Sequence, residues 1–140
     1  RVLLLDRLQR ALAHALLAAF RPGLSLGIAA LGRIQSAAGR DNAEALAYFG
    51  WTLALVPRQS PDLADADERV DAARLALAQA SELEPDYADP QCFLAIIEFQ
   101  FLGDAEAALP HIDTCEASNP PAEVASLVAG FAEEIRAAAT

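Results

Sequence analysis

The sequence predicts an all-α fold, a solenoid of about three helical hairpins followed by a capping helix. Of its 140 residues, 54% are apolar, and most of these are Ala and Leu without the alternating β-branched runs that indicate strands. A half-repeat also recurs 35 residues further along the chain, which is typical of helical units that bury their apolar faces against each other in one domain. Its members are Asp71-Ala72-Ala73, Leu77, Ala80 and Pro85, matched by Glu106-Ala107-Ala108, Ile112, Cys115 and Pro120.

Residues 1–42 predict a degenerate first hairpin. A leucine stripe with helical spacing indicates a helix over 2–20, which Arg21-Pro22-Gly23 ends, and a second helix is expected over 24–38. Charged and polar residues interrupt residues 2–20. No uninterrupted apolar stretch there is long enough to predict a membrane span. The stripe consists of Leu5, Leu8, Leu12 and Leu16.

Residues 43–86 predict a second hairpin. Its first helix is expected to run to about Val56, with Asp41 or Asn42 as the cap. Residues 57–67 are rich in acids and helix breakers and predict a long loop before a helix over 68–83. Because glycine inside a helix costs about 1 kcal/mol relative to alanine, Gly50 predicts that a neighbouring helix approaches closely at this point.

Residues 87–121 predict a third hairpin, with helices over 88–102 and 105–118 and Pro110 bending the second of them or delaying its start. Residues 122–140 are expected to form the capping segment. The helix predicted there runs over about 121–138. That helix has one apolar stripe and acidic residues elsewhere, as a terminal helix requires. The stripe consists of Val124, Leu127, Val128, Phe131 and Ile135.

The charge is distributed unevenly along the chain. The net charge is −10, but residues 1–40 carry +5 whereas residues 41–140 carry −15. An acidic body argues against nucleic acid, whose phosphates need a basic surface, and favours a basic or apolar protein partner. The alternative is that the acids only keep the chain soluble.

Residues 43–121 resemble the tetratricopeptide repeat family, whose unit is a hairpin of helices A and B about 34 residues long. The resemblance implies that a ligand lies against the helix A faces on a concave side. The matched positions are Gly50 in helix A, Gly103 in the turn, Ala73 and Ala108 at the first small site of helix B, Leu77 and Ile112 at its large site, Ala80 and Cys115 at its later small site, and Pro85 and Pro120 at the closing proline.

A narrower resemblance concerns the repeat domain of membrane-anchored proteins of c-type cytochrome biogenesis. The segments 45–51, 84–96 and 102–104 carry it, and a basic set of arginines without lysine is similar to that of high-GC actinobacterial relatives. The resemblance implies an extracytoplasmic domain at the cell membrane that holds apocytochrome c during haem attachment, tethered by a helix outside this chain. A cytoplasmic location is the alternative. The chain begins at Arg1 and lacks methionine, which indicates a processed product or an excised piece.

Carried over position by position, the resemblance implies an apolar and aromatic groove. Such a groove suits a basic amphipathic peptide that lies with its apolar face down. The alternative is that Trp51 and Phe93 belong to the core between repeats, because aromatic side chains are mostly buried. The expected lining residues are Glu44, Ala47, Trp51 and Ala54 of one helix, and Phe93, Ile97, Gln100 and Phe101 of another.

The two cysteines are expected to face each other across the third hairpin. In an antiparallel pair that turns near Gly103, Cys92 and Cys115 fall at opposing positions, so a disulfide in an oxidising compartment is one interpretation. The other is a pair of buried thiols in the core. A metal site with His111 is also conceivable, but it has too few ligands to be expected.

The sequence predicts neither an enzyme nor a cofactor. It contains no glycine-rich phosphate loop and no known motif that joins a nucleophile to a histidine. Function classes that remain are a peptide-binding module and, as the alternative, a scaffold that self-associates, as a homodimer, through the apolar first helix.

Overall fold

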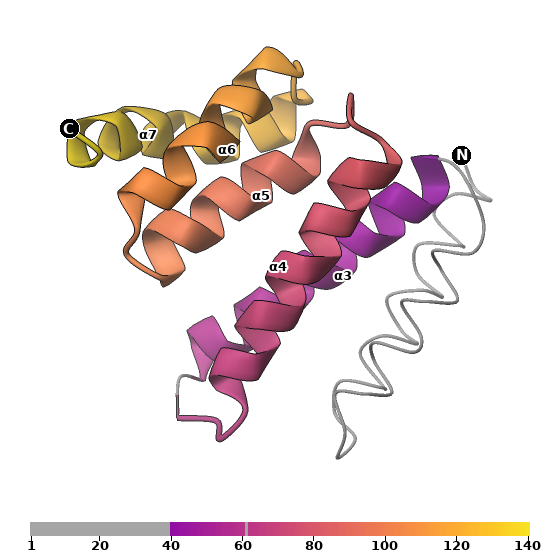
Figure 1. Cartoon of the computed structure of the whole chain (residues 1–140), viewed down its shortest axis with the longest axis vertical. Coiled ribbons are helices and arrows are strands. Elements are labelled where there is room, and N and C mark those ends of the chain that lie inside the picture. The colour runs from indigo at the N-terminus through magenta and orange to yellow at the C-terminus, as the bar shows by residue number, and fades with distance from the viewer. Residues whose placement is uncertain (1–39, 61) are drawn as a thin grey trace. The chain divides into compact units, whose positions relative to one another are not determined.

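Helices account for every regular element in the part of the chain that the computed structural model describes, residues 40–60 and 62–140 (Figure 1). The all-α prediction is therefore confirmed over these ranges. The predicted helices over 2–20 and 24–38, and with them the first hairpin and its self-association, lie outside the described residues. The elements are α3 (Arg40–Gln59), α4 (Ala66–Leu83), α5 (Asp89–Ile96), the π-helix η1 (Ile97–Phe101), α6 (Ala105–Ala117) and α7 (Ala122–Ala138).

The described elements belong to two compact units. The first holds α3 and α4, which pack together as a hairpin, and the second comprises Pro85–Thr140. In the second unit α5 and η1 pack along α6, and α7 contacts both α6 and α5 (Figure 1). The described part of each unit therefore contains one hairpin, and the stacking of the two hairpins into a solenoid stays a prediction.

The close approach predicted at Gly50 is confirmed. A Cβ atom at this position would lie 3.0 Å from the carbonyl oxygen of Ala73 and 3.0 Å from Cγ of Leu77. Both residues belong to α4, so the missing side chain of Gly50 is what lets the two helices approach.

The loop of the first unit is shorter than predicted at both ends. Helix α3 continues through Pro57 to Gln59, and the amide of Ser60 still donates to the carbonyl of Val56 at 2.9 Å. Helix α4 already begins at Ala66, since acids in a first turn interact favourably with the helix dipole rather than marking a loop. The expected cap is also wrong, because Asp41 and Asn42 lie inside α3.

The first helix of the third predicted hairpin, residues 87–121, ends differently from the prediction. A regular helix was expected over 88–102, but residues Ile97–Phe101 form a π-helix, in which the amide of Leu102 donates to the carbonyl of Ile97 at 3.0 Å. Gly103 then turns the chain with φ of 72°, a left-handed conformation that favours glycine.

The predictions for the last two helices are confirmed to within one residue. Asp104 caps α6 by accepting a hydrogen bond from the amide of Ala107 at 3.0 Å, so Pro110 does not delay the start of the helix. The cap fixes the first turn of the helix before Pro110 is reached.

The half-repeat forms equivalent parts of the two hairpins. Its small and large apolar positions have no solvent exposure in either hairpin, which is what a recurring helix-to-helix contact requires. These positions are Ala73, Leu77 and Ala80 in α4, and Ala108, Ile112 and Cys115 in α6.

Candidate functional site

Helix α3 has one face against α4 and a second face that keeps partial exposure. Gly50 defines the first face, and the buried Ala47 and Ala54, both predicted as groove residues, lie on the same side by helical spacing. Their burial reflects the small side chains that this close helix pair requires.

The second face of α3 carries the other two predicted residues. Glu44 and Trp51 are both half-buried. Tyr48 and Leu55 are half-buried as well and fall on the same stripe, because the four positions follow each other at intervals of three or four residues. Sequence reasoning missed Tyr48 and Leu55, although the same spacing rule from Trp51 would have included them.

The predicted residues of the second unit are divided in the same way. Phe93 and Ile97 are buried, Phe101 is half-buried, and Gln100 is exposed. Helix α5 is apolar nearly all around and is buried over almost its whole length, so only the π-helix that follows it brings predicted residues to the surface. Because the two predicted sets belong to separate units, their union in one groove stays a prediction.

An aromatic contact that sequence reasoning did not anticipate joins the π-helix to α7. The rings of Phe99 and Phe131 meet edge to face, with centroids 6.4 Å apart and an interplanar angle of 68°, an arrangement that aromatic pairs prefer. Both side chains are half-buried. Helical spacing in the sequence places Phe131 on the apolar stripe of α7, but it does not predict that Phe99 of η1 contacts it.

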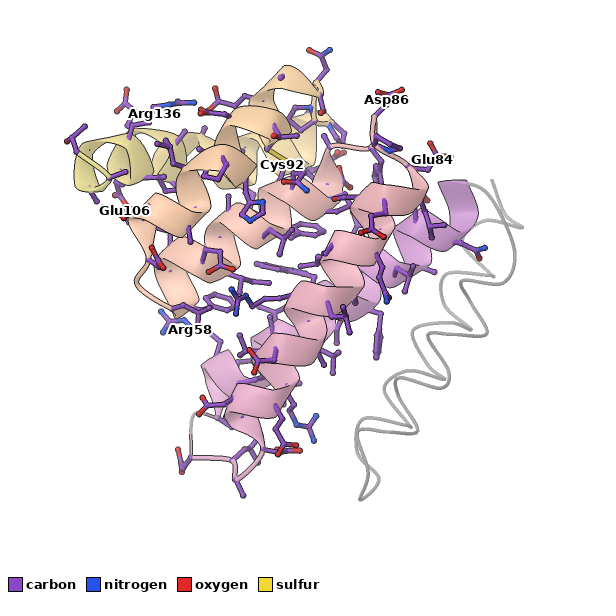
Figure 2. The ribbon with its side chains drawn as sticks, in the orientation of Figure 1. Arg58, Glu84, Asp86, Cys92, Glu106 and Arg136 are labelled. Atoms are coloured by element: carbon purple, nitrogen blue, oxygen red, sulfur yellow. A yellow bond between two sulfur atoms is a disulfide. The ribbon has the colours of Figure 1, made fainter. Side chains whose placement is uncertain are left out.

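A disulfide joins Cys92 of α5, which is labelled in Figure 2, to Cys115 of α6, with Cα atoms 4.9 Å apart. This is the pairing that the hairpin register indicated. Both sulfurs are in the bridge and are not available as thiolate ligands, and the described ranges contain no group of three metal-ligating side chains. Beside the bridge, Nδ1 of His111 and Oε1 of Gln91 lie 2.7 Å apart in a hydrogen bond, which adds a polar link between the same two helices.

The second unit is strongly acidic. Over residues 85–140 the only arginine is Arg136, whereas aspartate and glutamate occupy ten positions. Arg136 is engaged within the unit, with Nη2 2.8 Å from Asp113 and Nη1 3.1 Å from Glu116. The acids on the surface of this unit therefore attract cations with little internal compensation.

Comparison of the chain with models of protein families, with curated proteins and with solved structures finds no match. Among the described residues, no helix combines the length and the hydropathy that crossing a membrane requires. The function must therefore be argued from the surfaces themselves.

Proposed function

We propose that this protein is a non-catalytic interaction module that binds an apolar or amphipathic peptide. The observation that carries the proposal is the second face of α3, where Tyr48, Trp51 and Leu55 keep partial exposure while the opposite face packs on α4. Aromatic and aliphatic side chains on a helix face are the usual lining of a groove that accepts an amphipathic helix.

The negative charge of residues 41–140 indicates the charge of the peptide that the protein would bind. Residues 41–140 carry −15, which favours a basic peptide through long-range attraction and disfavours an acidic one. A basic amphipathic helix with its apolar side on α3 would match both the negative charge of the chain and the half-buried apolar side chains of that face.

The proposed setting is an extracytoplasmic assembly role, with apocytochrome c as the candidate partner. The resemblance to cytochrome biogenesis proteins of actinobacteria suggests this partner. The Cys92–Cys115 disulfide supports an oxidising compartment, because such bonds persist outside the cytoplasm.

A titration followed by the fluorescence of Trp51, the only tryptophan, tests the proposal. The probe is a helical peptide of Leu and Lys about five turns long, and a saturable shift is expected. Glu44→Lys on the same face should weaken binding roughly fivefold or more. Glu82→Lys is the control. Glu82 is exposed on α4, and its substitution changes the net charge of the protein by the same amount as Glu44→Lys.

Truncation of Phe93 is not a suitable test, because this side chain is only 2% exposed and its loss would open a cavity. If the peptide leaves the Trp51 signal unchanged, or if both lysine variants weaken binding equally, the α3 face is not the binding site. A concentration-dependent dimer in light scattering, without peptide binding, would favour the self-associating scaffold.

A further inference from the structure

The second unit has an apolar patch on the side of α7 that faces the π-helix. Its centre is the edge-to-face contact of Phe99 with Phe131, both half-buried. Leu127 lies one turn before Phe131 on the same side of α7 and is 42% exposed, and Leu102, directly after η1, is 46% exposed. We define the apolar patch as these four residues, Phe99, Leu102, Leu127 and Phe131.

The packing of α7 explains why this patch is open. Val124, Val128 and Ile135 turn the buried face of α7 towards its own unit, while Arg136 holds another side of the helix to α6. By helical spacing Leu127 lies well outside the buried face, so its side chain, 42% exposed, extends the apolar surface beside Phe131.

Acids surround the apolar patch. Glu123 and Glu134 precede and follow Leu127 and Phe131 on the same stripe of α7, and both are exposed. Asp104 lies two residues after Leu102 and is exposed as well. The only arginine of the unit, Arg136, is already engaged by Asp113 and Glu116. A docking partner that buries the patch must therefore offer apolar side chains flanked by cations.

We propose that the apolar patch is a docking site for the apolar face of a cationic amphipathic helix, whose Lys or Arg side chains pair with Glu123 and Glu134. This inference rests on the proposed peptide-binding function and names a surface of the second unit for it. Charge argues against a second copy of the same unit as the occupant, because two units that each contain ten acids and one arginine would repel each other.

The test uses the full chain and a fluorescein-labelled Leu/Lys helical peptide, with binding followed by fluorescence anisotropy. Leu127→Glu should weaken binding at least tenfold, because it places a carboxylate in the centre of the contact. The matched control is Leu75→Glu on α4, since Leu75 is 47% exposed and lies in the other unit. Glu123→Gln should weaken binding less and reduce its dependence on salt.

Equal affinity of the Leu127→Glu and Leu75→Glu variants for the peptide would overturn the proposal. So would tight binding of a Leu/Glu peptide of the same pattern, because the charge argument would then fail. Light scattering without peptide completes the test: a dimer that Leu127→Glu disperses would assign the patch to a second copy instead. An anisotropy change that depends on Leu127 without a Trp51 shift would support the patch and reject the α3 face.

Discussion

At the scale of single residues, the structure distinguishes two helical glycines that look alike in the sequence. Gly50→Ala should lower the free energy of unfolding by about 1 kcal/mol, because the clash with the backbone of Ala73 outweighs the gain in helix propensity. Gly130→Ala, where no atom lies within 4 Å of the new Cβ, should raise it by about 1 kcal/mol. Urea unfolding measures both values, and equal stabilisation by the two substitutions would contradict the close contact of α3 with α4.

A second residue-scale prediction concerns the start of α4. The Arg69 guanidinium forms an ion pair with the Asp65 carboxyl, with Nε and Oδ2 3.0 Å apart, and holds the pKa of Asp65 below its ordinary value. Because the lowered pKa belongs to the folded state, the carboxylate stabilises the protein above about pH 3.8, and this contribution is lost as the pH falls through the folded-state pKa.

Asp65→Asn should therefore be less stable than the parent at neutral pH and approach it in acid. Urea titrations at pH 7 and below pH 3.8 measure this difference. Glu82→Gln on the same helix controls for the loss of one negative charge. If the parent and Asp65→Asn differ in free energy of unfolding by as much in acid as at neutral pH, the ion pair is not the cause of the difference.

At the scale of elements, Arg136 links α7 to α6 through ion pairs. Figure 2 shows the Arg136 side chain extending from α7. Hydrogen bonds to Asp113 and Glu116 raise the pKa of Arg136 above its already high ordinary value, so the guanidinium stays charged. Arg136→Ala should lower Tm slightly, with an effect that shrinks as salt rises, because the ion pairs are exposed to solvent.

Arg74→Ala is the control for this effect. Arg74 is as exposed as Arg136, at 44%, and pairs with Asp71 of its own helix at 3.6 Å, a longer contact than those of Arg136. Thermal unfolding in low and high salt should therefore show a smaller change for Arg74→Ala. The reverse order would mean that the contact between α6 and α7 does not depend on Arg136.

At the scale of elements too, sequence patterns predicted the position of each helix better than the residues at which it begins and ends. Period and composition placed α6 and α7 to within one residue, because their stripes and caps are local signals. The helix end predicted before Pro57 is wrong, because α3 continues to Gln59. The π-helix was also missed, since a stretch such as Ile97–Phe101 has no simple sequence period of its own.

At the scale of the whole molecule, the disulfide should determine much of the stability of the second unit. The bond joins positions 23 residues apart, and closing a loop of this size contributes about 3 kcal/mol. Reduction should lower the free energy of unfolding by about that amount, as followed by circular dichroism in urea. The Cys92→Ala/Cys115→Ala variant should not respond to reductant, and two reactive thiols in the unfolded, unreduced chain would contradict the bridge.

The sequence by itself determined the helical class, the half-repeat and the register that brings Cys92 opposite Cys115, because each of these depends on spacing along the chain. Only the tertiary structure decided which side chains are available to a partner. Ala47 and Phe93 satisfied the same helix A pattern as Trp51 and Gln100, yet the first two are buried. Burial depends on which neighbouring helix covers each face. For α3 that covering is set by contacts with α4, and for α7 by contacts with α6 and α5, which no local period contains.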